Sequence, residues 1–482
     1  MKPRSPVVAI LGHVDHGKTT LLDYIRSSNI TAKEHGGITQ KIGAYEIDTK
    51  IPGYKTSKIT FIDTPGHEAF TKLRARGAQV ADIALLLIDG KDSLKPQTIE
   101  SISHIKAAGI PYIVIINKID LPDANPNKVK TDLMKHAVMV EGKGGNIPVA
   151  EISAKTGKGI PELLETILLV AAHEDFQYDP EAPSVAYIIE TKKDKRGVVV
   201  TIVMKNGVLK VADTIYAEEK KAKIRSLIND LGTRIQEVVP STPVELLGFE
   251  QLPTVGSLIQ RESQEAKKES TAEITTKAFT LQSITDIPVV EKQLSVIIKT
   301  DSQGSLEAID YTLSKQKNIK IILKGVGELG RSDIFLAKTT NSILIGFNSS
   351  IPKEVLDLAK QEKVIIKTYN IIYQLIEELT EVADLMKEKE EEEKHLKGEG
   401  KILATFIIEG EKIYGAKITK GKINLADQVE IYRNNNLFGK SKLVSLKIRA
   451  KPMELVKKDQ DCGMVFGPPL DIQVGDVVKS IS

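Results

Sequence analysis

The chain is poor in the residues that mark several protein classes. It has one cysteine, Cys462, among 482 residues, which excludes an internal disulfide framework and a metal cluster built from cysteines alone. No uninterrupted apolar run reaches the roughly 18 residues that a membrane-spanning helix needs. The apolar run Val7–Leu11 is shorter than the roughly 7–15 residues of a secretory signal core, and His13 and Asp15 follow it closely. We therefore expect a cytoplasmic protein with no membrane segment.

An excess of one charge is also missing. The 67 Lys and Arg residues nearly balance the 64 Asp and Glu residues, so any binding to nucleic acid must depend on local patches. Apolar residues make up 41% of the chain, enough for several cores, which excludes global disorder. The length of 482 residues predicts roughly three domains.

The first third of the chain alternates apolar runs with amphipathic stretches. Val7–Leu11, Ile59–Ile62 and Ile83–Ile88 predict buried parallel strands, and Leu94–Ala108 and Gly159–Ala172 predict helices between strands. This alternation indicates a doubly wound sheet, which we assign to residues 1–175. Two X-Pro pairs in residues 175–183 favour a linker after it.

The remaining residues predict four further parts. Short β-rich runs broken by Gly, Pro, Asn and Asp predict a β-barrel in residues 184–265. Strands and helices alternate in an α/β/α layer domain at 280–370, and an amphipathic pattern predicts a long connecting helix at 371–397. A second β-barrel is expected at 398–482, since Gly421–Val429 repeats the pattern of Gly207–Ile215. The fold class is multidomain α/β with two β-barrels.

A phosphate-binding motif follows the first predicted strand. The pattern G-x4-G-K-[ST] is matched by Gly12, His13, Val14, Asp15, His16, Gly17, Lys18 and Thr19. Its glycines let backbone N–H groups approach phosphates, and the following helix N-terminus adds partial positive charge. Lys18 can reach the β- and γ-phosphates of a nucleotide, and the Thr19 hydroxyl can ligate Mg²⁺.

A second motif ends the strand Ile59–Ile62. It consists of Asp63, Thr64, Pro65, Gly66 and His67. Asp63 would face the phosphate motif across the carboxyl edge of the sheet and hold Mg²⁺ through water. The backbone N–H of Gly66 could meet a γ-phosphate, and His67 is suited to orienting a water molecule where Ras-like proteins carry Gln. We reject a metal site at His13, His16 and His67, since no further ligand completes it.

Two further motifs follow later strands. Asn117, Lys118, Ile119 and Asp120 come after Tyr112–Ile116. The Asp120 carboxylate can accept the N1–H and 2-amino bonds of guanine, Asn117 can bond the opposite base edge, and the Lys118 stem can cover the base. Ser153, Ala154 and Lys155 can supply a backbone N–H to the guanine oxygen.

A glycine-rich polar segment, Glu34–Lys41, lies between the first two motifs. The hydroxyl and N–H of its Thr39 could close on Mg²⁺ and the γ-phosphate. The alternative is a plain flexible loop.

Together, these motifs resemble those of the translational GTPases. Several segments also resemble bacterial translation initiation factor two: Leu22–Arg26, Gly36–Tyr45, Asp63–Thr71, Arg74–Gln79, Asn117–Asp120, Ser241–Gly248, Ile345–Asn348 and Cys462–Gly463. The resemblance covers essentially the whole chain. Family members usually carry a long extension before the GTPase (G) domain, which we expect this chain to lack.

The resemblance implies both chemistry and partners. It implies a monomeric GTPase that uses GTP and Mg²⁺, with His67 as the catalytic residue that orients water once large-subunit rRNA docks. It further implies contact with the small and large ribosomal subunits and with other initiation factors. The last barrel would hold formylmethionyl initiator tRNA, and the protein would deliver this tRNA to the small subunit. Joining of the two subunits would follow.

The last barrel departs from the family pattern near Arg449 and around Cys462. Its cations could contact phosphates of a tRNA acceptor end, and Cys462 could line a methionine-sized pocket; these cations are Lys440, Lys442, Lys447, Arg449, Lys451, Lys457 and Lys458. The alternative is a solvated lysine face with Cys462 in the core. Two other functions stay open: another translational or ribosome-associated GTPase, and a GTP-dependent ribosome-binding scaffold that delivers no tRNA.

Overall fold

The computed structural model describes residues 1–26, 43–261, 293–408, 411–434, 436–449 and 451–481. Thr39 and the segment Glu34–Lys41 lie outside these residues. The described chain forms two compact units, one made of 1–261 with 295–380 and the other containing 381–481. Each is described by itself.

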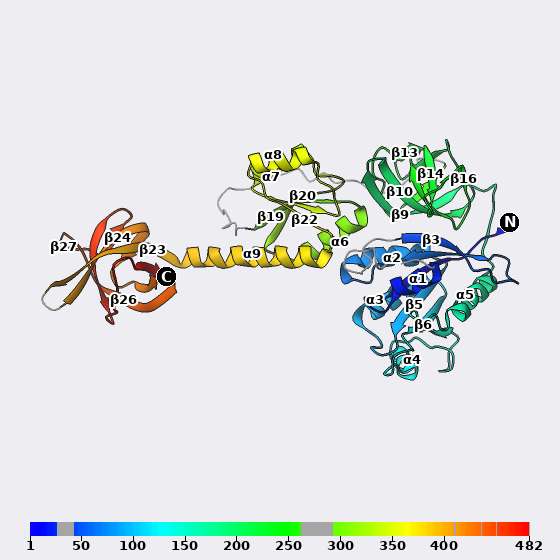
Figure 1. The fold of residues 1–482 in the computed structure, drawn as a ribbon, viewed down its shortest axis with the longest axis horizontal. Helices are drawn as coiled ribbons and strands as arrows, with labels where there is room; N and C mark the ends of the chain where they lie inside the picture. The colour runs from blue at the N-terminus through cyan, green and yellow to red at the C-terminus, as the bar shows by residue number, and fades with distance from the viewer. Residues whose placement is uncertain (27–42, 262–292, 409–410, 435, 450, 482) are drawn as a thin grey trace, which may run out of the picture. The chain divides into compact units, whose positions relative to one another are not determined.

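The first part of the chain is a six-stranded sheet (Figure 1). Its strands, in spatial order, are β3 (Gly43–Asp48), β4 (Lys58–Asp63), β2 (Val7–Gly12), β5 (Ile83–Asp89), β6 (Tyr112–Asn117) and β7 (Val149–Glu151). Only β3 is antiparallel to its neighbour. Every residue of β2 and β5 is buried, as expected for parallel strands covered on both faces.

Helices cover both faces of this sheet. Side chains of α1 (Lys18–Arg26) and α5 (Ile160–Glu174) share a core with Ile10 and Phe61. Side chains of α2 (Thr71–Val80), α3 (Pro96–Ala108) and α4 (Pro126–Lys135) share the opposite core with Leu86 and Val114. The 3₁₀ helix η2 (Glu68–Phe70) precedes α2, and β1 (Lys2–Pro3) pairs with β8 (Gln177–Tyr178). The predicted doubly wound α/β fold is confirmed.

An antiparallel eight-stranded sheet follows. In spatial order its strands are β13 (Lys220–Lys223), β12 (Thr214–Ala217), β18 (Leu258–Gln260), β9 (Val185–Asp194), β10 (Gly197–Asn206), β17 (Pro243–Leu247), β14 (Ser226–Asn229) and β15 (Arg234–Ile235). Strands β11 (Leu209–Lys210) and β16 (Glu237–Val238) pair separately. Ile188, Ile202 and Leu246 meet in one core inside this first barrel.

A four-stranded layer completes the first unit. Its order is β20 (Ile319–Val326), β19 (Leu294–Thr300), β21 (Ile343–Phe347) and β22 (Ile366–Tyr369), with helices α6 (Gln303–Leu313), α7 (Arg331–Thr340) and α8 (Lys353–Gln361). Helix α9 (Ile372–His395) follows, and its Ile372, Leu375 and Leu379 are buried at helical spacing. Within the described residues, no helix combines the length and apolarity needed to cross a bilayer.

The second unit contains a closed barrel. Its ring runs β23 (Leu396–Ile408), β30 (Val477–Ile481), β25 (Gln428–Arg433), β26 (Asn436–Ile448), β29 (Asp461–Gly467) and β24 (Glu411–Asn424), and pairing of β23 with β24 closes it. Two short strands add to this ring: β27 (Lys451–Pro452) pairs with β26, and β28 (Leu455–Lys457) pairs with β24. Closure leaves the ring without a free edge, and the predicted C-terminal barrel is confirmed.

The sequence repeat forms the same turn in both barrels. Asp213 accepts a hydrogen bond from the Lys210 N–H at 2.7 Å, and Asp427 accepts one from the Asn424 N–H at 2.9 Å. The alanine before each aspartate has φ near +70°, at 75° and 71° respectively. An Asp side chain that accepts the backbone N–H of the residue three positions earlier stabilises such a turn. The sequence repeat therefore marks the same turn conformation in both barrels.

A buried ion network joins the six-stranded sheet domain to the first barrel. Asp82 accepts hydrogen bonds from Arg4 Nη2 at 2.8 Å, Lys205 Nζ at 2.7 Å and the Val7 N–H at 2.8 Å. Burial opposes ionisation of Asp82, but the hydrogen bond from Arg4 and the charge of Lys205 outweigh it and lower its pKa. Asp82 is therefore ionised at neutral pH and compensates two largely buried cations, whose side chains are 10% and 15% exposed.

Replacing Asp82→Asn should destabilise this junction by about 3–5 kcal/mol, because Lys205 would stay buried without its carboxylate. The measurement is thermal unfolding followed by circular dichroism, since the chain has no tryptophan. Because the pKa of Asp82 is lower in the folded state, its ionised carboxylate contributes fully to the free energy of unfolding above the unfolded-state pKa of about 3.9. This contribution is lost as the pH falls through the folded-state pKa of Asp82.

Asp123→Asn is the matched control, because its carboxylate pairs with Lys91 at the surface, where the side chains are 67% and 52% exposed. Asp123→Asn should lower the free energy of unfolding by less than about 1 kcal/mol. Equal stability of the two variants would contradict the network's importance.

Candidate functional site

One edge of the first sheet gathers the motif residues found in the sequence. The phosphate motif follows β2, Asp63 ends β4, Asn117 ends β6, and Ser153 comes shortly after β7. These are the carboxyl ends of parallel strands, where such sheets bind ligands. All residues of the predicted nucleotide site except Thr39, which lies outside the described chain, belong to these strand ends, to the loops after them or to the start of α1.

The phosphate motif forms a narrow backbone loop around Lys18. Lys18 Nζ donates to the carbonyl oxygens of Gly12 at 3.0 Å and His13 at 2.7 Å. Burial lowers the pKa of Lys18 to about 8, although the charge of Asp63 opposes this shift. A Cβ at Gly12 would lie 2.4 Å from the Leu87 carbonyl oxygen, so only glycine fits there. The loop leads into α1, whose second residue is Thr19, and it fits a phosphate group.

The middle of the loop is held by side chains from other elements. The Val14 N–H donates to Gln97 Oε1 of α3 at 3.1 Å, a contact that the sequence did not predict. His16 is buried and its Nδ1 lies 3.2 Å from the Leu87 carbonyl oxygen; burial lowers its pKa to about 4. Asp15 is exposed with φ of 63°. His16 is therefore a neutral packing residue.

The segment after β4 lies directly against the phosphate loop. A Cβ at Gly66 would be 2.4 Å from Lys18 Nζ and 2.8 Å from the Val14 nitrogen. Thr64 Oγ1 donates to the Ile10 carbonyl oxygen at 2.6 Å, and Asp63 is 1% exposed. Carboxylate and hydroxyl oxygens beside a phosphate cradle are the donors that Mg²⁺ prefers, so Asp63 and Thr19 fit a magnesium site.

Asn117 bridges two loops. Its Nδ2 donates to the His16 carbonyl oxygen at 2.8 Å, and its Oδ1 accepts the Ala154 N–H at 2.9 Å. A Cβ at Gly17 would lie 2.4 Å from Asn117 Nδ2, so Gly17 makes room for the bridge. The sequence predicted a base contact for Asn117; in the structure both ends of its amide bond the protein.

The neighbours of Asn117 differ in exposure. Lys118 has φ of 61°, and its Nζ lies 2.7 Å from Asp89 Oδ2. Asp120 is exposed, which leaves its carboxylate accessible to a ligand. In the loop that Asn117 holds, Ser153 Oγ is buried and accepts the Thr156 N–H at 3.2 Å, while Lys155 is exposed.

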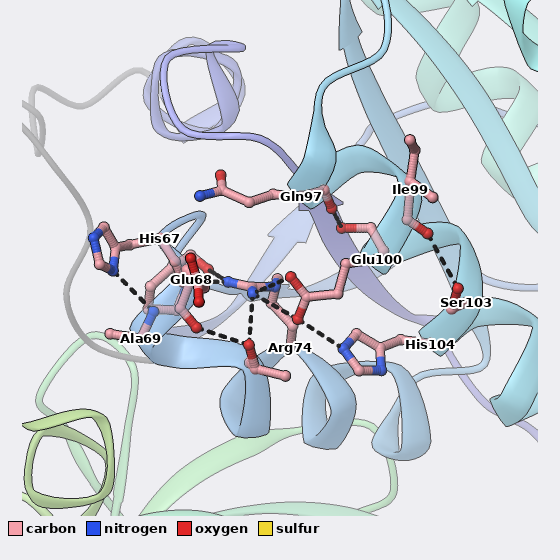
Figure 2. Close-up of polar contacts among 12 residues, drawn as sticks. His67, Glu68, Ala69, Arg74, Gln97, Ile99, Glu100, Ser103 and His104 are labelled. Carbon is pink, nitrogen blue, oxygen red and sulfur yellow. Dashed lines mark hydrogen bonds and ion pairs between the residues drawn. The ribbon is translucent and has the colours of Figure 1, made fainter. Parts of the chain in front are cut away.

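A fully buried arginine anchors the loop that carries His67 (Figure 2). Arg74 Nη1 donates to the carbonyl oxygens of Pro65 and His67, and its Nη2 donates to both carboxylate oxygens of Glu100 at 2.8 and 2.7 Å. Burial opposes ionisation of Glu100, but bonds from His104 and Arg74 outweigh it and lower its pKa to about 2. The sequence did not predict this role for Arg74, which the structure places on the buried face of α2 together with Leu73, Gly77 and Ala78.

The His67 ring is fixed on two sides. Its Nδ1 accepts the Ala69 N–H at 2.9 Å, so in the neutral ring the proton is on Nε2. The ring also forms a T-shaped contact with Tyr373, the second residue of α9, with ring centroids 4.3 Å apart. Burial and then the charge of Arg74 lower the pKa of His67, which keeps the ring neutral at pH 7.

A second candidate site lies in the C-terminal barrel. A cavity of about 610 Å³ has apolar walls from Leu403, Phe406 and Ile413, with Lys447 and Arg449 exposed at its rim. Cys462 lines this cavity and also belongs to the barrel core. The two roles that the sequence suggested for Cys462, in a pocket or in the core, are therefore compatible. Burial and then the charge of Asp461 raise the pKa of the Cys462 thiol to about 12, so it stays protonated.

The sequence matches three domain families. Residues 3–173 match the elongation factor Tu GTP binding domain, 183–261 match elongation factor G domain 2, and 262–380 match translation-initiation factor 2. Translation initiation factor IF-2 of Thermotoga sp. (strain RQ2) is 42% identical over 501 residues, covering 99% of this chain and 71% of that protein. This chain belongs to the translation initiation factor IF-2 family. The family predicted from the motifs is therefore confirmed.

Other relatives differ in length and fold similarity. IF-2 of Bartonella tribocorum is also 42% identical, and the chain spans only 59% of that protein's length. The crystal structure of GDP-bound aIF5B from Aeropyrum pernix is 25% identical, with a TM-score of 0.48, and covers 100% of this chain and 92% of that one.

Asn117→Ala should weaken GDP binding by about 5- to 150-fold, because it removes two hydrogen bonds worth about 0.5–1.5 kcal/mol each that hold the phosphate loop. The measurement is a titration with fluorescent GDP. Asn125→Ala is the matched control, since the Asn125 side chain caps α4 by accepting the Lys128 N–H. Parent-like GDP affinity in Asn117→Ala would show that the bridge does not shape the site.

Proposed function

We propose that the chain is a GTPase of translation initiation whose hydrolysis depends on the ribosome. The observation that carries the proposal is the assembly of phosphate, metal and base motifs at one sheet edge around the Asn117 bridge. Lys18 and the loop N–H groups would hold the β- and γ-phosphates, and Asp120 would accept the guanine N1–H and 2-amino bonds. Thr19 and Asp63 would hold Mg²⁺, which when bound neutralises charge on the phosphate oxygens.

His67 is the proposed catalytic residue. Its neutral ring can orient a water molecule toward the γ-phosphate only after it leaves the Ala69 N–H and the Tyr373 ring. Breaking one hydrogen bond and one aromatic contact costs about 1–3 kcal/mol, which keeps unassisted hydrolysis slow. Docking of large-subunit rRNA would supply that free energy and orient the ring.

His67→Ala should leave GTP affinity nearly unchanged and reduce ribosome-stimulated turnover by about 10²–10⁴-fold, the usual contribution of a positioned acid–base group. In the parent, turnover should begin to fall at a lower pH than a histidine of ordinary pKa would give, because burial and the charge of Arg74 lower the pKa of His67. The assay is phosphate release with and without ribosomes. His173→Ala, which changes an exposed histidine, is the control, and equal turnover in parent and His67→Ala would refute the role.

We propose that the cavity in the C-terminal barrel takes the formylmethionyl end of initiator tRNA. Its apolar walls suit a methionine side chain, and a neutral formamide avoids burying the charge of a free α-amino group. Lys447 and Arg449 at the rim would contact acceptor-end phosphates. The chain would then act as a cytoplasmic monomer with other initiation factors, placing the tRNA on the small subunit and promoting subunit joining.

Charged initiator tRNA should bind about tenfold more tightly when it is formylated, a difference of about 1.4 kcal/mol. Filter binding with both tRNAs measures this ratio. Phe406→Ala should reduce the preference, whereas Leu437→Ala, an exposed apolar residue outside the cavity lining, should keep it. Equal affinity for both tRNAs in the parent would favour another translational GTPase or a ribosome-binding scaffold without tRNA delivery.

A further inference from the structure

The α/β/α layer has a reversal in strand order that the proposed function does not use. The chain runs from β19 to its neighbour β20 and then returns to β21 on the other side of β19. Strands β19 and β21 are parallel, with Thr300 opposite Phe347 at their carboxyl ends. In open α/β sheets, ligands bind in the crevice outside the strand ends at such a reversal.

The strand ends around this crevice are tied together. The Gly327 N–H after β20 donates to the Thr300 carbonyl oxygen of β19 at 2.8 Å, and the Asp301 N–H donates to the Phe347 carbonyl oxygen of β21 at 3.2 Å. Ser349 Oγ donates to the Gly327 carbonyl oxygen at 3.0 Å. The three loops therefore form one wall rather than three independent segments.

The hairpin between β9 and β10 of the first barrel forms the opposite wall. Lys192 and Ser302 form an antiparallel bridge, which holds this hairpin against the loop after β19. A cavity of about 440 Å³ lies between the two walls, within the size range of small-molecule sites. Its lining residues from the strand ends are Asp301, Gly327, Glu328, Asn348, Ser349 and Ser350.

Two cations in this cavity have no ion-pair partner within the described parts of the chain. Lys193 and Lys195 line the cavity, whereas Arg196 beside them is neutralised by Asp194 and Glu245. Gly327 has φ of +126°, and the nearest atom to a Cβ built there would be Lys193 Cδ at 3.5 Å. Lysine ammonium groups next to a glycine turn suit a phosphate.

The first turn of α6 is already filled by a protein carboxylate. Glu190 Oε1 of β9 accepts the Gly304 N–H at 3.2 Å, and a Cβ at Gly304 would lie 2.6 Å from Glu190 Oε2. A bound anion would therefore lie toward Lys193 and Lys195 and away from this helix end. Asp301 and Glu328 also line the cavity, and carboxylate oxygens can accept several hydrogen bonds from hydroxyl groups; Glu328 Oε1 already accepts the Ser350 hydroxyl at 2.6 Å.

We propose that this cavity binds a mononucleotide, with its phosphate on Lys193 and Lys195 and its ribose hydroxyls facing Asp301 and Glu328. Phosphate and vicinal hydroxyls together match the lysines and carboxylates of the lining. The site is separate from the loops of the first sheet and does not depend on the function proposed for them.

The probe is adenosine 5′-monophosphate, titrated by calorimetry into the full chain with saturating GDP and Mg²⁺, so that the first site is closed. Adenosine 5′-monophosphate should bind at one site at least about tenfold more tightly than adenosine, because adenosine lacks the phosphate. Lys193→Ala with Lys195→Ala should weaken this binding at least about tenfold. Lys220→Ala with Lys221→Ala, on the same barrel outside the cavity lining, should change it less than about twofold.

Ser350→Trp provides an independent test, since this exposed serine lines the cavity and a tryptophan there would fill it. It should abolish binding while circular dichroism and GDP affinity stay at parent values. The proposal is overturned if adenosine 5′-monophosphate shows no saturable binding up to about 10 mM, or if the Lys193 and Lys195 changes leave its affinity unaltered. Binding of a short RNA through these lysines without binding of the mononucleotide would also overturn it.

Discussion

The bridge made by the Asn117 amide is the interaction on which the nucleotide site depends. It joins the phosphate loop at His16 to the loop at Ala154, although these residues lie far apart in the sequence. Buried hydrogen bonds of a side-chain amide are strong because water cannot replace them. Together with the Lys18 bonds to Gly12 and His13, the bridge sets the loop's shape from protein contacts alone.

The same site is coupled to the rest of the first unit through Gly66 and His67. Gly66 lies against Lys18, and the next residue is held through its carbonyl oxygen by Arg74 and through its ring by Tyr373 of α9. A γ-phosphate meeting the Gly66 N–H would therefore act on a segment that is packed against the start of α9. A nucleotide in this site would in this way be linked to α9 through Gly66 and His67 without contacting the helix itself.

Local patterns predicted much of the fold, because the hydrophobicity of a strand and the spacing of glycines can be seen within a short stretch of sequence. The parallel sheet, the closed C-terminal barrel and the Asp213 and Asp427 turns all follow from such patterns. The bridging role of Asn117, the burial of Arg74 and the packing of Tyr373 on His67 could not be predicted. Each depends on partners that only tertiary structure brings together, and the base-reading pattern around Asn117 suggested a different contact.

Hydrogen exchange of the Ala154 amide in nucleotide-free protein tests the central claim most directly, because this N–H is the donor that Asn117 holds. The account predicts protection of about a hundredfold or more before any nucleotide is added, and no protection in Asn117→Ala. Exchange at the unprotected rate until GDP binds would contradict it, since the nucleotide and not the protein would then assemble the site.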